Sequence, residues 1–158
     1  MSLIVDGTAG ITYPNSTVQA SAGVVLQVVQ GTYATPQFST TSTTYVATNL
    51  TATITPKFST SKILAIVSAQ MTNTTPGASA YSTIYRNSTN LGGGSQSSLQ
   101  AYYSSSGYQY VSCVMEILDS PATTSATTYT VYLKASSNTA YLNDITSTNT
   151  IILMEIAG

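Results

Sequence analysis

Residues 128–135 read TYTVYLKA, and this stretch decides the fold class. Tyr129, Val131, Leu133 and Ala135 recur at every second position, so their side chains share one face of an extended chain. A helix would instead place apolar residues three and four positions apart. The opposite face carries Thr128, Thr130, Tyr132 and Lys134. The stretch therefore predicts a β-strand with one face in a core and one face in water.

Outward from this strand, eight further segments have strand-like patterns. They are residues 24–29, 43–47, 51–55, 62–71, 80–86, 99–103, 108–118 and 150–156. The links between them are rich in Gly, Pro, Ser, Thr and Asn, which is typical of turns. No segment carries a capped helical pattern. Many short strands with such links predict an all-β fold, an antiparallel jelly roll or β-sandwich.

The 158 residues suit one folded domain, which we expect at residues 24–158, preceded by an arm at residues 1–23. The arm holds short extended pieces broken by Gly and Pro and is too short to fold alone. It is either a frayed terminus or a segment that orders against neighbouring copies or a docking partner. In the second case the contacts are expected from Ile4, Val5, Ile11, Tyr13 and Val18.

Two strands are apolar on both faces, at residues 62–71 and 150–156. In an antiparallel sheet one face commonly meets water, so a second apolar face indicates that something covers the outside. Either a loop packs over the sheet, or another subunit does. We favour a subunit interface with threefold symmetry. Its predicted residues are Leu64, Ile66, Ile151, Leu153, Ile152 and Met154.

Charged residues make up 6% of the chain, against about 25% in a typical soluble domain. Four Lys and Arg and a net charge of −1 argue against a nucleic-acid partner and against an anionic membrane surface. So small a net charge also gives a free monomer little protection against association. The composition favours a subunit of a larger assembly.

The residues for catalysis are largely missing. The chain has no His, so no Ser-His-Asp or Cys-His arrangement can form, and a Ser-Lys pair has no specific signal in so Ser-rich a chain. Glu116 and Glu155 are the best carboxylate pair for glycoside hydrolysis, but each is more simply paired with a Lys or Arg. Cys113, the one cysteine, lies in an apolar run and is expected to be a buried, inert thiol. We therefore predict no enzyme activity, no cofactor and no metal site.

Tyrosine is unusually common, with 12 Tyr against two Phe. Residues 101–110, AYYSSSGYQY, are interpreted as a hairpin in which Tyr103 faces Tyr108. Such cross-strand pairs stabilise sheets, which is one explanation. The other is an exposed patch that contacts a glycan or protein, formed by Tyr102, Tyr103, Tyr108 and Tyr110. The nearby stretch 90–95 is then a rim of that patch, or else a plain linker.

The N-terminal half carries a motif. Residues 5–19, VDGTAGITYPNSTVQ, resemble a short motif of phage fibre proteins, common in cyanophage and marine phage, in which Gly and Ile/Leu-Thr-Phe/Tyr precede Pro-Asp/Asn-x-Thr-x-Gln. Residues 25–31, 53–57, 61–64 and the closing stretch 152–156 also look like those proteins. The stretch 72–127 is less distinctive.

This resemblance implies a non-enzymatic, trimeric virion protein whose C-terminal head is a jelly roll similar to tumour-necrosis-factor-like folds. It also implies partners: copies of itself, other virion proteins of the tail, baseplate or capsid, and a host surface glycan or protein. A fibre usually has a long shaft, whereas only a short arm precedes this head. We therefore expect a short tail fibre or fibre tip, anchored by the arm, or alternatively a capsid decoration or cement protein. The N-terminus has no signal-peptide pattern and no stretch long enough to span a bilayer, so synthesis in the host cytoplasm is expected.

Overall fold

The computed structural model describes residues 4–6, 10–12, 18–19, 23–34, 37–94, 96–106, 109–142 and 147–158. In these residues the regular structure is β-strand, and no helix is present. The strands, in chain order, are β1 (Ile4–Asp6), β2 (Gly10–Thr12), β3 (Val18–Gln19), β4 (Val25–Tyr33), β5 (Phe38–Thr40), β6 (Val46–Ile54), β7 (Lys62–Asn73), β8 (Ser79–Arg86), β9 (Thr89–Asn90), β10 (Gln100–Tyr103), β11 (Val111–Asp119), β12 (Thr127–Ala135), β13 (Ala140–Leu142) and β14 (Asn149–Ile156).

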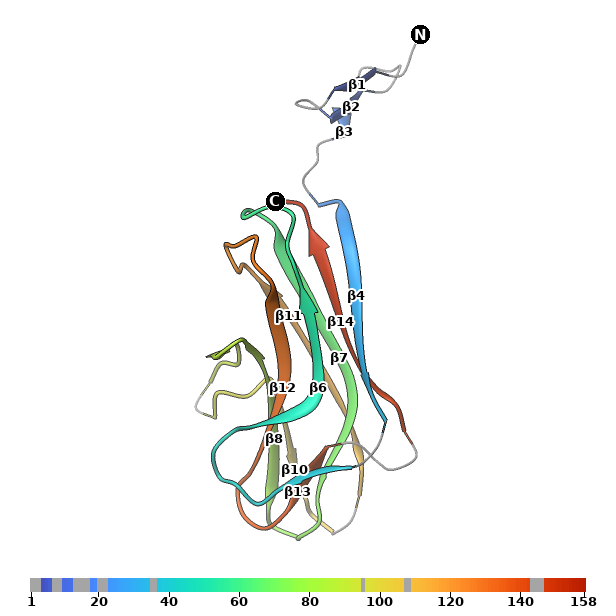
Figure 1. The fold of residues 1–158 in the computed structure, drawn as a ribbon. Helices are drawn as coiled ribbons and strands as arrows, with labels where there is room; N and C mark the ends of the chain where they lie inside the picture. Colours follow the sequence, from blue (N-terminus) through green and yellow to red (C-terminus); the bar gives the residue numbers. More distant parts are fainter. Residues whose placement is uncertain are drawn as a thin grey trace.

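Two antiparallel sheets pack face to face, with their strands along the long axis of the sandwich (Figure 1). Sheet I has the order β4-β14-β7-β11, and the far part of β7 also pairs with β13, which pairs with β5. Sheet II has the order β6-β12-β8-β10, with β9 on the end of β8. β4 begins and the chain ends at the same end of the sandwich (Figure 1). The pieces β1, β2 and β3 pair with one another in a separate small sheet.

The strand connections are those of a jelly roll. If the eight strands of the two orders are numbered along the chain, sheet I reads 1-8-3-6 and sheet II reads 2-7-4-5. The first and last strands are therefore neighbours, and the chain passes from sheet to sheet at every step but one. This is the arrangement of two interleaved Greek keys that defines the fold. The predicted antiparallel jelly roll or sandwich is confirmed.

The core lies between the sheets and is built by the alternation seen in the sequence. On β12 the side chains of Tyr129, Val131 and Leu133 are fully buried, as predicted for residues 128–135. They meet apolar side chains of β7 and β14, among them Ile63, Ala65, Val67, Ile151 and Leu153, which are also fully buried. The apolar residues at every second position of these strands thus all face inward and pack into one continuous core.

One strand, β6, covers residues 46–54, where two strands at 43–47 and 51–55 were predicted; residues 43–45 precede it and are not in a strand. The pairing register with β12 shifts between Thr130 and Tyr132, so β6 carries an irregularity at this point. The buried hydroxyl of Thr48 stabilises it: this oxygen donates to the Val131 carbonyl at 2.8 Å and accepts from the Leu50 amide at 3.2 Å. A bulge of this kind lets a strand continue through a polar stretch.

The hairpin predicted for residues 101–110 is wrong. β10 pairs with β8 in sheet II, whereas β11 pairs with β7 in sheet I. The connection between them therefore crosses from one sheet to the other and does not turn back on itself. A jelly roll requires this crossing between its fifth and sixth strands, and local sequence pattern carries no sign of it. Tyr108 lies outside the described residues.

Candidate functional site

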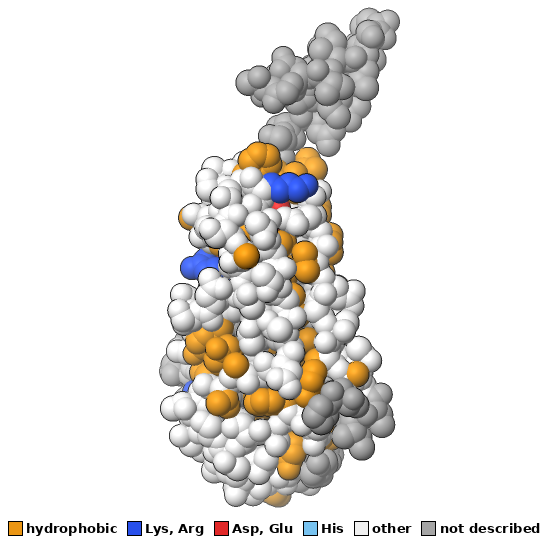
Figure 2. All heavy atoms as spheres, viewed as in Figure 1, with side chains coloured by type: hydrophobic (Ala, Val, Ile, Leu, Met, Phe, Trp, Pro, Cys, Tyr) orange, Lys and Arg blue, Asp and Glu red, His pale blue; other side chains and the backbone are white. Residues whose placement is uncertain are grey.

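The surface is poor in charge. On the face shown in Figure 2 few Lys, Arg, Asp or Glu side chains are visible, and the hydrophobic side chains lie in separate patches. Two regions on the outer faces of the sheets stand out against this background. One is an apolar area on sheet I, and the other is a tyrosine-rich pocket on sheet II.

A row of apolar side chains crosses all four strands of sheet I on its outer face. Val28 of β4 pairs with Met154 of β14, Met154 pairs with Leu64 of β7, and Leu64 pairs with Leu118 of β11. The two end members are 57% and 52% exposed, and the two central ones are half-buried by their neighbours. We call these four residues the apolar row.

More apolar side chains flank the apolar row. Ile152 and Ile66 pair in the next row, and Val25 lies opposite Ile156 at the end of the sheet. Among the described residues, two charged side chains share this outer face, Lys62 and Glu116. Neither has an ion-pair partner among the described residues. The face is therefore apolar in its middle and carries one charge of each sign.

The predicted interface residues divide between the two faces of sheet I. Leu64, Ile66, Ile152 and Met154 point outward and remain partly exposed. The prediction is wrong for Ile151 and Leu153. Both point inward and are fully buried in the core of a single chain, so no partner can contact them. Successive side chains of a strand point to opposite faces, so one strand cannot give all its residues to an interface.

The residues predicted for the arm lie in the small sheet. Ile4 and Val5 are in β1, Ile11 is in β2 and Val18 is in β3, with Val5 opposite Ile11 in the backbone pairing. Tyr13 lies outside the described residues. The anchoring role of these residues stays a prediction.

The structure does not bring the predicted tyrosine patch together. Tyr102 packs against the core, and Tyr103, next to it on β10, points the other way and is 64% exposed. Tyr110 lies beyond the crossing connection, where its hydroxyl accepts a hydrogen bond from the Gln37 side chain. These side chains therefore do not share one surface.

A different set of tyrosines clusters on the outer face of sheet II. The rings of Tyr85 (β8) and Tyr132 (β12) stack with centroids 3.8 Å apart, and the Tyr45 ring meets Tyr85 edge-on at 6.2 Å. The ammonium of Lys134 lies 4.7 Å from the centre of the Tyr45 ring and 5.1 Å from that of Tyr81. Both distances are in the range of cation–π attraction.

This cluster borders a pocket of about 360 Å³, which we call the tyrosine–lysine pocket. Its lining consists of Thr43, Thr44, Tyr45, Tyr85, Asn90, Gln96, Ser97 and Lys134. Lys134 donates to the Gln96 side chain at 3.2 Å, and the Tyr45 hydroxyl donates to the Gln96 carbonyl at 3.1 Å. Burial, together with the neighbouring phenols of Tyr85 and Tyr81, outweighs a hydrogen bond with Ser98 and raises the pKa of Tyr45 to about 12. The phenol is therefore neutral at physiological pH.

The loop that forms one wall of the pocket is held by Asn90. Its side-chain oxygen accepts from the Thr83 hydroxyl at 2.7 Å and from the Gly92 amide at 2.8 Å, while its nitrogen donates to the Ser97 carbonyl at 2.9 Å. A Cβ on Gly92 would collide with the Thr83 hydroxyl and the Ser97 backbone, so only glycine fits there. Of the stretch considered as a rim, Asn90 lines this pocket, which is not the predicted tyrosine patch.

Sequence reasoning missed this pocket because its tyrosines come from separate strands. Tyr45, Tyr85 and Tyr132 are far apart in the chain and meet only through the pairing of β8 with β12 and β12 with β6. One signal was available: Tyr132 and Lys134 lie on the polar face of residues 128–135, where a half-buried strand presents side chains to solvent. The strand order, which is needed to bring Tyr45 and Tyr85 to these residues, could not be read from the sequence.

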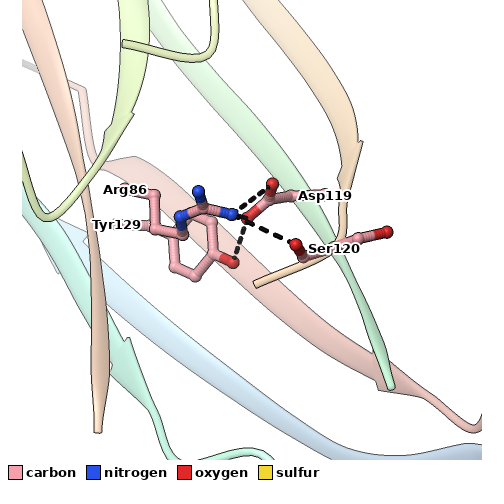
Figure 3. A network of polar contacts seen from close by, with 4 residues as sticks. All are labelled: Arg86, Asp119, Ser120 and Tyr129. Carbon is pink, nitrogen blue, oxygen red and sulfur yellow. Dashed lines mark hydrogen bonds and ion pairs between the residues drawn. The ribbon is translucent and has the colours of Figure 1, made fainter. Parts of the chain in front are cut away.

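The ion pair between Arg86 and Asp119 joins the two sheets (Figure 3). Nη1 of Arg86, at the end of β8, donates to the carboxylate of Asp119, at the end of β11, at 2.8 and 3.0 Å and to the Ser120 carbonyl at 3.3 Å. The buried Tyr129 hydroxyl donates to the same carboxylate at 2.7 Å. Burial, and then this hydrogen bond to an anion, raise the pKa of Tyr129. The polar groups of Arg86, Asp119, Ser120 and Tyr129 are thus bonded to one another, which indicates a structural role.

Glu116 and Glu155, the carboxylates considered for glycoside hydrolysis, are not brought together, and neither has an ion-pair partner among the described residues. Glu116 is exposed on the outer face of sheet I, whereas Glu155 points inward and is fully buried. Glu155 accepts from the Gln27 side chain at 2.5 Å and from the Lys57 amide at 2.7 Å. Its burial alone would raise the pKa, but hydrogen bonds from Gln27 and from the amides of Lys57 and Phe58 outweigh it and hold the pKa below the ordinary value. Two carboxylates on opposite sides of a sheet cannot flank one substrate.

The remaining groups offer little chemistry. Cys113 is buried, as predicted, and burial raises the pKa of its thiol to about 11 despite a 3.0 Å hydrogen bond with Ser82. Within the described ranges, no three His, Cys, Asp or Glu side chains are grouped closely enough to hold a metal ion. The same residues include no helix long and apolar enough to cross a membrane.

Comparisons with known proteins agree with the fold. No protein-family model matches the chain, and no curated protein matches it. Among solved structures, a chain in the structure of infectious bursal disease virus Gt strain is similar over 100% of this chain, with a TM-score of 0.51 and 12% sequence identity. The protein spans 42% of the length of that chain. At so low an identity the likeness shows the fold: an antiparallel β-sandwich that also occurs in a virus.

Proposed function

We propose that this protein is a non-enzymatic structural component of a virion that assembles with copies of itself through the outer face of sheet I. In this proposal three copies form a short tail fibre or fibre tip. The N-terminal arm attaches the trimer to other virion proteins, and the head contacts the host surface.

The apolar row carries the proposal. Single exposed apolar side chains are normal on a protein surface, but a contiguous patch across four strands marks an interaction site. Covering one large apolar side chain stabilises an assembly by about 1.5–3 kcal/mol. No described loop covers the row, because its end members remain more than half exposed.

A second copy is the partner that best fits this face. The face carries both Lys62 and Glu116 without ion-pair partners among the described residues, so it can match the charges of an identical chain. A closed ring of copies forms when one part of this face on each copy contacts another part of the face on the next copy. The fibre-like motif at residues 5–19 supports the number three and the virion location, and the jelly-roll fold is compatible with both.

Replacing Leu64 tests the assembly. Leu64→Lys removes apolar burial worth about 2 kcal/mol per copy and would bury an unpaired ammonium, which costs more. We expect light scattering after size exclusion to show a trimer for the wild type and a monomer for Leu64→Lys. The matched control is Thr53→Lys, which adds the same charge on the exposed face of sheet II and should remain trimeric. A Leu64→Lys variant with an unchanged mass and unchanged thermal unfolding would contradict the proposal.

Immunogold labelling of virions tests the location. Label at the tail or its tip supports the fibre proposal. Label on the capsid faces would replace it with the other expected role, a decoration protein that stabilises the shell.

A further inference from the structure

The tyrosine–lysine pocket lies on the outer face of sheet II, whereas the proposed assembly uses sheet I. Assembly through sheet I therefore need not cover it. Its volume of about 360 Å³ is at the lower end of the range of small-molecule sites, which run from about 300 to 1,000 Å³. A pocket of this size suits a ligand of one or two rings.

The pocket holds one positive charge that no described carboxylate neutralises. Lys134 has no ion-pair partner among the described residues, and no Asp or Glu is among the lining residues. Its ammonium is fixed in place by the rings of Tyr45 and Tyr81 and by the Gln96 side-chain oxygen. A fixed, half-buried cation without a counter-ion favours an anionic ligand group.

The aromatic wall is rigid. Tyr85 is stacked on Tyr132, and the Tyr45 ring is held edge-on against Tyr85 with its hydroxyl bonded to the Gln96 backbone. Tyrosine offers a flat apolar surface with a polar tip and loses little entropy when it binds. A pyranose ring has the complementary shape, with apolar C–H faces and a rim of hydroxyls.

The rest of the lining is neutral and polar. Thr43, Thr44, Asn90 and Ser97 supply hydroxyl or amide groups around the pocket. These groups donate and accept hydrogen bonds, as sugar hydroxyls require, and they offer no deep apolar cavity for a peptide side chain. Aromatic surface, neutral hydrogen-bonding groups and a single cation therefore occur together in one place.

We infer that the tyrosine–lysine pocket binds a sugar that carries a carboxylate, such as a uronic or sialic acid, with the carboxylate at Lys134 and the ring against the Tyr45–Tyr85 wall. This inference deepens the host contact in the proposed function by naming its ligand class. The neutral phenol of Tyr45 keeps its proton, which it donates to the Gln96 backbone carbonyl, so the ring stays in place in the wall and its oxygen can accept from a sugar hydroxyl.

Calorimetric titration of the whole chain tests the inference. The probes are methyl glucuronide, the methyl glycoside of N-acetylneuraminic acid, and methyl glucoside as the neutral match for the first. We expect at least one acidic sugar to bind about tenfold or more tightly than the glucoside, as a charge-assisted hydrogen bond provides. Lys134→Met should lower the affinity for the acidic sugar by about the same factor. Tyr45→Ala should weaken the binding of acidic and neutral sugars alike.

Lys57→Met is the matched control, because Lys57 is exposed, lies outside the pocket and loses the same charge. It should bind like the wild type, and thermal unfolding should show all variants folded. Affinity for both acids no greater than for the glucoside, no binding of either acid at millimolar concentration, or an unaffected Lys134→Met variant would each overturn the inference.

The two proposals fail separately. The pocket is formed within one chain, so sugar binding can be measured even if the wild type proves to be a monomer. A pocket that binds nothing leaves the effect of Leu64→Lys on assembly unchanged.

Discussion

Glu155 is a charged side chain in the interior of the sandwich, and its ionisation is tied to folding. Its carboxylate receives hydrogen bonds from Gln27 of β4 and from the Lys57 amide in the link between β6 and β7. It therefore joins the first strand of the sandwich, the last strand and a loop. These donors favour the ionised form, which is why the pKa is lowered in spite of burial.

We expect Glu155 to make stability fall in acid. Because its folded-state pKa lies below the ordinary value of 4.5, its contribution is fully present above that pH and is lost as the pH drops through the lower folded-state value. Glu155→Gln should cost about 2 kcal/mol at pH 7, since one buried donor loses its charged acceptor. It should also flatten the dependence of stability on pH below 4.5.

Urea unfolding at pH 7 and at pH 3 measures both effects. Glu116→Gln is the control, because Glu116 is exposed and should change the free energy of unfolding by less than about 0.5 kcal/mol. Equal stability of Glu155→Gln and the wild type at pH 7 would show that the buried carboxylate does not join these elements.

At the scale of elements, most strands of the sandwich could be predicted, because each carries its own alternation. β7, β8, β12 and β14 begin and end within two residues of the predicted ranges. The short strands β5, β9 and β13 were missed. With two or three residues each, they have too few positions for a period. β9 and β13 pair with the longer strands β8 and β7, and β5 pairs with β13.

At Gly31 a strand of sheet I approaches the backbone of sheet II closely. A Cβ on this residue of β4 would collide with the backbone carbonyl of Thr51 in β6. We expect Gly31→Ala to destabilise the fold by about 3 kcal/mol, the upper end of the usual cost of overpacking, because backbone cannot move aside as a side chain can. Gly93→Ala, where a Cβ meets nothing within 4 Å, should change stability by less than about 0.5 kcal/mol. Thermal or denaturant unfolding of the pair decides this, and equal effects would mean that the two sheets can separate locally at no cost.

At the scale of the whole molecule, the sequence predicted the class of fold but not what the fold brings together. The strands at 62–71 and 150–156 correctly indicated an outer apolar face, because each has apolar residues at successive positions and therefore on both faces. The apolar row also needs Val28 and Leu118, and these join it only through the order β4-β14-β7-β11. The tyrosine–lysine pocket depends in the same way on the order of sheet II. Strand order is set by long-range pairing, which single-sequence periodicity does not contain.

The two sheets thus present outer faces of different character. Sheet I is apolar across its middle, with Val28 and Leu118 largely exposed, while sheet II carries the aromatic and polar pocket. In the proposed trimer the first face is covered by sister chains and the second remains free for a ligand.

The central claim is that other copies of the chain cover the outer face of sheet I. Native mass spectrometry of the wild-type chain at micromolar concentration tests it most directly. We predict a species with three times the mass of the 16.5 kDa chain, which separates into single chains only on activation. A stable monomer under the same gentle conditions would contradict the account, because the apolar row would then face water in the working protein.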